Sequence, residues 1–312
     1  ALFVLAVCAC VVAGCSKPPS NVRDATGDDV WFIDMAEANG LVHQHVSGFS
    51  GKPLLPEIVG GGAALADVDG DGDLDVYVVQ SGRYLGDPEN AKALSAPTNQ
   101  LFLNRGDGHF APADGGAAAD RGYGMGVATG DYDNDGDVDL YVTNLGANVL
   151  LRNDGRGQFE DVSESAGVAD PNWSTAAAFV DADGDGDLDL FVVNYLNWSL
   201  AVEKECMSRG RPTYCAPNTY ATPAMDRFYR NNGDGTFTDV TLEAGINTRF
   251  GNGLGIAIAD FDADGRADLF VANDGMADQL WINQGGLRFE DQADYWGVAV
   301  NNQGVATAGM GV

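Results

Sequence analysis

The sequence predicts an all-β protein built from repeated four-stranded units, and three observations support this fold class. The composition is rich in turn-forming residues, with 42 Gly and a total of 46 Asp and Glu among 312 residues, so long helices are not expected. A nine-residue acidic motif occurs four times along the chain. A β-hairpin pattern follows each motif. The hydrophobic content of 45% is sufficient for a large core.

The acidic motif occupies residues 67–75, 131–139, 181–189 and 260–268. It has Asp at positions 1, 3, 5 and 9 and Gly at position 6, and position 7 is Asp in three copies but Arg266 in the fourth. A short oxygen-rich loop with a Gly turn is what Ca²⁺ requires, and such crowded carboxylates are costly without a cation. Because an Arg side chain cannot bind a cation, we expect position 7 to donate its backbone carbonyl.

The sequence therefore predicts about four calcium sites. Their residues are Asp67, Asp69, Asp71, Asp73, Asp75, Asp131, Asp133, Asp135, Asp137, Asp139, Asp181, Asp183, Asp185, Asp187, Asp189, Asp260, Asp262, Asp264, Arg266 and Asp268. These loops are not EF-hands, which need Glu at position 12 and a helix afterwards. Position 12 is Val in every copy, inside an apolar run rich in β-branched and aromatic residues. Such runs predict strands buried on both faces.

Glycine-rich segments lead into three of the acidic loops. One of them, 251–255 (GNGLG), could be read alone as a phosphate-binding loop, but it leads into an acidic loop instead of a helix. Close packing of strands is the preferred explanation for these glycines. Hairpins are predicted at 101–110, 150–159, 228–237 and 280–289. A unit is then strand, calcium loop, strand, connection, strand, turn and strand, which is the content of one β-propeller blade.

The units resemble FG-GAP (VCBS-type) repeats, the blades of the integrin α-chain propeller, over residues 30–312. Their tails (FEDVSESAGV from Phe159, FTDVTLEAGI from Phe237 and FEDQADYWGV from Phe289) resemble more narrowly the cartilage acidic protein (ASPIC/UnbV) family. This resemblance implies an extracellular calcium-bound propeller, generally without established catalysis. The C-terminal ASPIC module usual in that family does not occur in these residues.

The two ends of the sequence predict an incomplete ring. Residues 32–41 match the tail of a unit, and GMGV at 309–312 repeats GMGV at 124–127. We therefore expect about five of roughly seven blades, with the N-terminal segment completing the last blade of the intact propeller. Loop spacing predicts insertions near 81–98 and 195–225.

The N-terminal residues predict export. Residues 1–14 are uncharged and nearly all apolar but too short to span a membrane, so we interpret them as a lipoprotein signal peptide. Residues 12–16 (VAGCS) resemble a bacterial lipobox with lipidation at Cys15; the alternative is an ordinary signal with an incidental Cys. Residues 15–29 would then form a tether and 30–312 the propeller. The predicted location is extracytoplasmic, at the cell envelope or surface.

Cysteine usage agrees with that compartment. Cys8 and Cys10 would leave with the signal and Cys15 would carry the lipid, so that Cys206 and Cys215 are the remaining pair. We predict a disulfide between them, with two free thiols as the alternative.

Charge and motifs exclude some functions. With 17 Lys and Arg against 46 acids, the formal net charge is −29, which argues against nucleic-acid binding. No nucleophile elbow, HExxH or P-loop occurs. His43 and His45 could bind a metal or act as a base, but ordinary surface histidines are the simpler explanation; His109 occupies a variable turn position.

The sequence thus favours an adhesion or ligand-recognition module for an extracellular protein or glycan. The alternatives are a polysaccharide lyase or hydrolase on a propeller scaffold, or a purely structural domain. An aromatic ligand platform is conceivable near the third-unit insertion, with packing of the insertion as the competing explanation. Its residues are Trp173, Tyr195, Trp198, Tyr214 and Tyr220.

Overall fold

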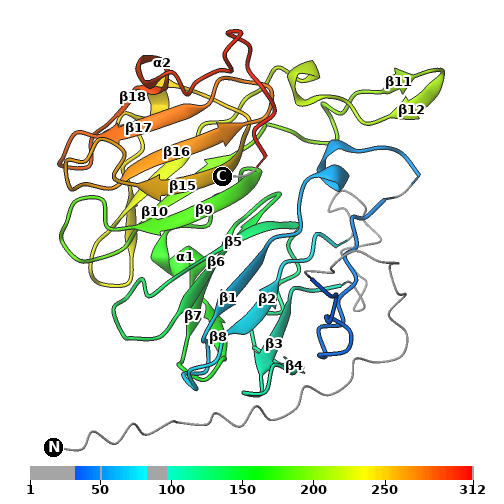
Figure 1. Cartoon of the computed structure of the whole chain (residues 1–312), viewed down its shortest axis with the longest axis vertical. Coiled ribbons are helices and arrows are strands. Elements are labelled where there is room, and N and C mark those ends of the chain that lie inside the picture. Colours follow the sequence, from blue (N-terminus) through cyan, green and yellow to red (C-terminus); the bar gives the residue numbers. More distant parts are fainter. Residues whose placement is uncertain (1–31, 50, 83–96, 311–312) are drawn as a thin grey trace, which may run out of the picture.

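The computed structural model describes residues 32–49, 51–82 and 97–310. Four antiparallel sheets of four strands each follow one another along the chain (Figure 1), and we call them blades 1 to 4. The fold class predicted from the sequence is confirmed, as a set of propeller blades that does not close into a ring. The predicted signal peptide, the tether and Cys15 lie outside the described residues, as do 83–96 of the first insertion.

Each blade contains four consecutive strands, except that the insertion separates the second and third strands of blade 3. Blade 1 consists of β1 (Ala63–Ala66), β2 (Asp75–Val78), β3 (Gln100–Asn104) and β4 (Phe110–Ala113). Blade 2 consists of β5 (Gly124–Gly130), β6 (Asp139–Asn144), β7 (Val149–Asn153) and β8 (Phe159–Asp161). Blade 3 consists of β9 (Ser174–Val180), β10 (Asp189–Asn194), β13 (Arg227–Asn231) and β14 (Phe237–Asp239). Blade 4 consists of β15 (Gly253–Ala259), β16 (Asp268–Asn273), β17 (Gln279–Asn283) and β18 (Phe289–Asp291).

Helical structure among the described residues is limited to single turns. These are α1 (Ser163–Ala166), α2 (Ala293–Trp296), η1 (Leu55–Ile58), η3 (Pro217–Thr219) and η4 (Ile246–Thr248). None of the described helices has the length and apolarity needed to cross a bilayer. The scarcity of helix agrees with the high Gly and Asp content of the sequence.

The first strands of the blades lie side by side, with β5 beside β1 and β9 between β5 and β15 (Figure 1). Glycine permits this approach: a Cβ atom added at Gly126 in β5 would lie 2.5 Å from the Thr175 backbone oxygen in β9. Close strand packing therefore accounts for the glycine-rich segments. The second strands of the two middle blades are fully enclosed: every residue of β6 and of β10 is buried, because these strands have neighbours on both faces.

The hydrophobic core lies between neighbouring blades. One cluster joins Tyr77 and Leu101 of blade 1 to Leu140 and Leu151 of blade 2. Similar clusters join blade 2 to blade 3 and blade 3 to blade 4. Each blade therefore depends on the next one to bury its apolar face, as expected for stacked repeats.

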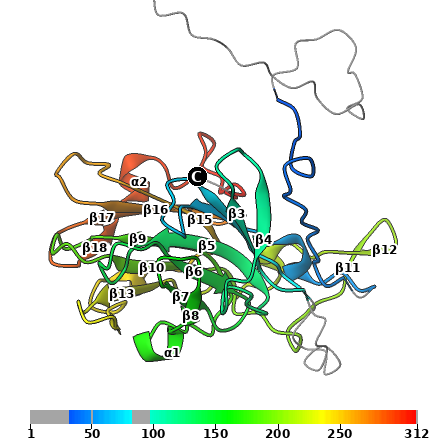
Figure 2. The same ribbon diagram turned by 90° about the horizontal axis from the view of Figure 1, so that it is seen from below.

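The insertion in blade 3 carries a two-stranded hairpin, β11 (Cys206–Ser208) and β12 (Arg211–Thr213), which projects away from the blades in both views (Figures 1 and 2). A disulfide joins Cys206 to Cys215. The candidate aromatic platform is not an open surface: Trp173, Tyr195, Trp198 and Tyr220 are at most 8% exposed and pack in one cluster with Leu54 and Leu55. Packing of the insertion is therefore the correct interpretation of these four aromatics.

The segments expected to count toward a fifth blade form no sheet of their own among the described residues. Residues 36–40 form turns, and the Phe110 N–H at the start of β4 donates to the Asn39 oxygen at 2.8 Å. The same bond links later blades, for example the Phe289 N–H to the Ala244 oxygen at 2.9 Å. The N-terminal segment thus occupies the place that the tail of a preceding blade would take. Four complete blades are described, where about five were expected.

Candidate metal centres

Each acidic loop joins the first strand of a blade to the second as the loop of an antiparallel hairpin. In blade 1, Asp75 opens β2 and pairs with Ala66, the last residue of β1. The other three loops have the same register: Asp139 pairs with Gly130, Asp189 with Val180 and Asp268 with Ala259. The same end of every blade therefore carries the loop, and the strand pairing sets where its carboxylates lie.

Backbone geometry explains the glycine at position 6. Its φ lies between 90° and 96° at Gly72, Gly136, Gly186 and Gly265, a region that other residues rarely adopt. Position 4 is also left-handed in all four loops, at Gly70, Asn134, Gly184 and Ala263, with φ between 58° and 78°. Two left-handed residues fold the loop back on itself, which brings the carboxylates of positions 1 and 3 close to a third, from position 5 in blades 1 and 3 and from position 9 in blades 2 and 4.

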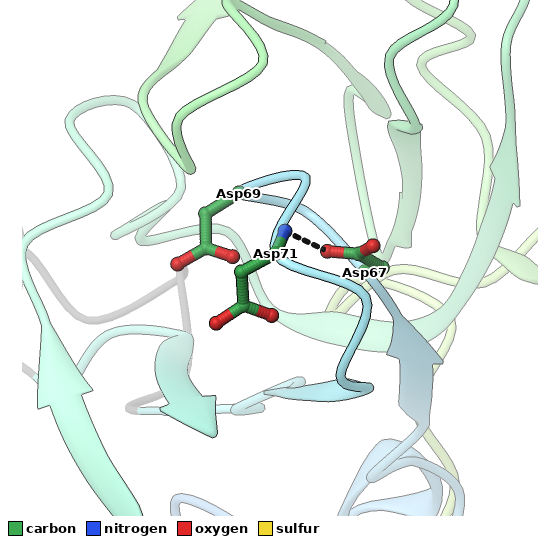
Figure 3. Close-up of side chains that lie close together, drawn as sticks. All are labelled: Asp67, Asp69 and Asp71. Atoms are coloured by element: carbon green, nitrogen blue, oxygen red, sulfur yellow. Dashed lines mark hydrogen bonds between the residues drawn. The ribbon is translucent and has the colours of Figure 1, made fainter. Parts of the chain in front are cut away.

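Each loop forms a group of three carboxylates with ligand oxygens within 4.8 Å of one another. The groups are Asp67, Asp69 and Asp71; Asp131, Asp133 and Asp139; Asp181, Asp183 and Asp185; and Asp260, Asp262 and Asp268. Figure 3 shows the first group, in which the Asp71 N–H donates to Asp67 Oδ1 at 3.1 Å. Oxygens at this spacing could hold one metal ion in each blade.

The position-1 carboxylate organises the loop backbone. Asp67 accepts the N–H groups of Gly70 and Gly72 at 2.9 Å each, and Asp131 likewise accepts those of Asp135 and Gly136 at 3.0 Å. The position-5 carboxylate accepts the N–H of position 7 at 2.9 Å in all four loops. These bonds orient the carboxylates and leave further lone pairs on their oxygens free for a cation.

The position-3 carboxylate supplies the observation that most favours a cation. Asp69 Oδ1 and Asp133 Oδ1 are buried and have no hydrogen-bond partner. An unpartnered buried carboxylate oxygen is costly unless a charge compensates it. Burial, with the neighbouring Asp carboxylates as a second cause, raises the pKa of both groups. The donor set is all oxygen and all anionic, which suits a hard divalent cation.

The position-9 carboxylate is a buried anchor. Asp139 accepts the N–H of Tyr132, at loop position 2, on Oδ2 at 3.2 Å and the N–H of Asn153, at the end of β7, on Oδ1 at 2.8 Å. Asp75, Asp189 and Asp268 make the same two bonds in their blades. Burial raises the pKa of Asp139 and of Asp189 to about 7.

The position-7 side chains lie over the hairpin turn between the third and fourth strands. A Cβ added at Gly155 would be 2.5 Å from Asp137 Oδ2, and one at Gly233 would be 2.8 Å from Asp187 Oδ2. Arg266 donates from Nε to the Asn283 oxygen at 2.8 Å. No position-7 side chain belongs to a carboxylate group within the described part of the chain; that this position donates its backbone carbonyl stays a prediction.

A further residue, for which no role was predicted, is the Asn that ends the third strand of every blade, namely Asn104, Asn153, Asn231 and Asn283. Its backbone N–H binds the position-9 carboxylate, and its Nδ2 donates to the position-8 carbonyl of the same loop at 3.0 to 3.2 Å. Its recurrence at one offset in all four hairpins was the signal that could have identified it.

The histidines make no comparable centre. His43 Nδ1 lies 2.7 Å from Gln100 Oε1, and the His43 and His45 rings are 6.4 Å apart. Burial lowers the pKa of His45. Neither belongs to a metal-binding group among the residues described. His109 contacts Asp107 within its hairpin turn at 3.2 Å.

A protein-family model, the FG-GAP-like repeat, matches residues 67–142, 131–192 and 215–271, together more than half of the chain. Among curated proteins, cartilage acidic protein 1 of Xenopus tropicalis is 35% identical and that of Homo sapiens 37% identical over 68 residues. This segment is 21% of the chain and 10% of the length of those relatives.

Solved structures give weaker similarity. A lectin of Agrocybe aegerita that recognises non-reducing terminal N-acetylglucosamine superposes with a TM-score of 0.41 and 18% identity, over 75% of this chain and 52% of the lectin. A chain of the Photorhabdus luminescens Tc holotoxin pore has a TM-score of 0.33 and 18% identity, over 74% of this chain and 9% of its own.

Proposed function

The chain belongs to the family of FG-GAP-like repeat proteins, and on that premise we propose that it is a calcium-stabilised module that recognises a protein or glycan ligand outside the cytoplasm. The observation that best supports calcium binding is that one carboxylate oxygen of Asp69 and one of Asp133 are buried without a hydrogen-bond partner. These residues belong to two of the four carboxylate groups. Catalysis is not part of the proposal.

In the proposed sites the carboxylates of positions 1 and 3 hold Ca²⁺ together with position 5 in blades 1 and 3 and with position 9 in blades 2 and 4. The bound ion would supply positive charge that compensates these carboxylates. The loop residues themselves tie the end of the first strand to the start of the second, so a filled loop would rigidify each hairpin. Extracellular calcium modules often bind at about 10⁻⁴ to 10⁻³ M, and each site would add roughly 2.7 kcal/mol of stability at a hundredfold excess over its Kd.

The extracytoplasmic location is supported by the disulfide between Cys206 and Cys215, since such bonds persist in oxidising compartments. The proposed lipid anchor at Cys15 is supported only by the lipobox-like residues 12–16.

Calcium dependence is tested by thermal unfolding in CaCl₂, in MgCl₂ and in EDTA. We expect the melting temperature to rise with calcium and to respond weakly to magnesium, which prefers a smaller octahedral shell. Asp133→Asn, which removes one charge from the carboxylate group of blade 2, should reduce the calcium response. Glu164→Gln removes one charge at an exposed position in α1 and should leave it intact. Equal melting temperatures in calcium and in EDTA, with metal-free protein confirmed by elemental analysis, would refute the metal role.

Recognition is tested with glycan and protein arrays, with and without calcium. Retention of one ligand class without turnover is the expected result. Release of shortened glycan products would instead indicate a polysaccharide-active enzyme.

A further inference from the structure

The Asn at the end of the third strand connects neighbouring metal loops in blades 2, 3 and 4. Its Nδ2 reaches the position-2 carbonyl of the loop in the preceding blade, at 2.8 Å in each case. The three bonds run from Asn153 to the Val68 oxygen, from Asn231 to the Tyr132 oxygen and from Asn283 to the Ala182 oxygen. Because the same Nδ2 also donates to its own loop, one side chain holds two loops.

These bonds join into a continuous ladder across the blades. The Tyr132 carbonyl in loop 131–139 accepts from Asn231 of blade 3. The Asn231 N–H donates to Asp189 Oδ1 at 2.9 Å, and Asp189 Oδ2 accepts the Ala182 N–H at 3.2 Å in the next loop. The Ala182 carbonyl then accepts from Asn283 of blade 4. The position-2 residue is therefore tied at its N–H to its own blade and at its carbonyl to the following blade.

The ladder is shielded from water where two blades meet. Val68 and Tyr132 are 2% exposed and Ala182 is 3% exposed. Asn153, Asn231 and Asn283 are at most 4% exposed. Water cannot readily replace a lost bond at such sites, so each bond restrains the backbone more than it would on an exposed surface. In blade 4, where no further blade is described, the position-2 residue Phe261 is 40% exposed.

The position-2 residue lies between positions 1 and 3, which carry the first two carboxylates of the loop. The two peptide groups of position 2 therefore determine the distance between these carboxylates. In blade 2 these carboxylates are Asp131 and Asp133, on either side of Tyr132. Hydrogen bonds to both the N–H and the carbonyl of Tyr132 therefore fix the position of the two carboxylates relative to each other. The geometry of one metal site therefore depends on the blade that follows it.

We propose that these Asn side chains are positioning residues that couple neighbouring loops, so that ordering one loop orders the next and raises its affinity for a cation. The cation part of the inference rests on the proposed calcium binding. A loop already ordered by its neighbour loses less conformational freedom when it binds. Because coupling between two sites is reciprocal, the effect runs in both directions along the blades.

The chain contains its own control. Asn104 of blade 1 makes the bonds within its blade, from Nδ2 to the Leu74 oxygen at 3.1 Å and from its N–H to Asp75 Oδ1 at 2.8 Å. No bond from Asn104 to another acidic loop is found among the described residues. Asn231→Ala thus removes the Nδ2 bonds to its own loop and to the preceding blade, whereas Asn104→Ala removes only an Nδ2 bond to its own loop. Both variants keep the backbone N–H that donates to the position-9 carboxylate.

The experiment measures amide hydrogen exchange, by mass spectrometry, of peptides covering residues 131–139 in EDTA and across a calcium series. In Asn231→Ala we expect faster exchange of this loop in EDTA and a calcium midpoint about two- to tenfold higher, the loss expected from one buried hydrogen bond. In Asn104→Ala the same peptides should behave as in the wild type. Asn153→Ala provides a second test, with the effect then expected in loop 67–75.

The coupling would be overturned if loop 131–139 of Asn231→Ala kept the exchange rate and the calcium midpoint of the wild type. It would also be overturned if Asn104→Ala changed this loop as much as Asn231→Ala does. Failure of the wild-type loops to respond to calcium would contradict the proposed function instead, and the comparison in EDTA would still decide whether Asn231 orders the neighbouring loop.

Discussion

At the scale of single residues, Asp226 is a buried carboxyl group that lies outside the four acidic loops. It is 5% exposed and accepts the Asn194 N–H at 2.8 Å. Asn99 and Asn148 make the equivalent bond in blades 1 and 2, and Asp278 makes it in blade 4. Burial, and secondarily the neighbouring Asp170 carboxylate, raises the pKa of Asp226 from 3.8 to about 7.

The raised pKa predicts how Asp226→Asn changes stability with pH. Between pH 3.8 and about 7 the folded state holds a proton that the unfolded state releases, so the wild type loses stability as pH rises through this window. The amide side chain of the variant does not titrate, so the variant does not lose stability in this way as the pH rises. We expect the variant to gain up to about 3 kcal/mol relative to the wild type between pH 5 and pH 8, because about two pH units of this range lie below the folded-state pKa.

Chemical denaturation of both proteins at the two pH values, in saturating calcium, measures this difference. Asp278→Asn is the matched control, because Asp278 is only partly buried and should give a smaller pH-dependent gain. An Asp226→Asn difference that does not change with pH would show that the carboxyl group is not held protonated by burial.

Ala263 is the one Ala at position 4 of a loop, with φ at 62° where blades 1 and 3 have Gly. A left-handed conformation strains a residue that has a Cβ atom. Ala263→Gly should therefore raise the free energy of unfolding by about 0.5–1 kcal/mol, measured by chemical denaturation. Ala216→Gly, at φ −71°, should lower it, since Gly there only adds unfolded-state entropy. A loss of stability in Ala263→Gly would contradict the strain argument.

At the scale of elements, the projecting hairpin β11–β12 is held at its base. The disulfide closes a short loop with a sequence separation of 9. Cys215 is 4% exposed and belongs to the cluster that contains Trp198 and Tyr220. The phenol of Tyr220 and the indole of Trp198 both donate to Glu203, at 2.6 Å and 2.7 Å. Packing and the covalent link therefore act on the same few residues.

Replacing both cysteines by Ser should loosen the insertion and leave the blades intact. The chain-entropy model assigns such a short loop at most about 3 kcal/mol. We expect limited proteolysis to cut the variant within residues 199–219 sooner than the wild type, with little change in the calcium response. Identical cleavage kinetics would mean that packing alone holds the hairpin.

At the scale of the whole molecule, blade 4 exposes a face that the other blades bury. Trp296 is 44% exposed and Val298 is 40% exposed. Their counterparts at the end of blade 3, Ala244 and Ile246, are 1% and 0% exposed because blade 4 covers them. An exposed apolar face of this kind promotes association.

When residues 1–312 are produced alone, we expect the chain to self-associate through this face, and Trp296→Glu to weaken self-association by about tenfold or more, since a buried Trp side chain removes roughly 150–250 Å² from water. Sedimentation velocity over a concentration series measures the effect. Leu242→Glu, at a position in blade 3 that is 65% exposed, introduces the same charge away from this face and should change little. Equal behaviour of the two variants would exclude the blade-4 face as the contact.

The four-stranded unit, its acidic loops and their order were all predictable from the sequence, because strand alternation, turn glycines and Asp spacing are local properties of a few consecutive residues. Contacts between blades were decided by the tertiary structure. The bond from Asn231 to the Tyr132 carbonyl joins residues 99 positions apart, and burial of Trp173 depends on η1 packing beside it. The exposure of Trp296 likewise depends on which blade lies next to it. Residue pattern determines what each blade is, whereas the stacking of blades determines which of its polar groups are shielded, coupled or left exposed.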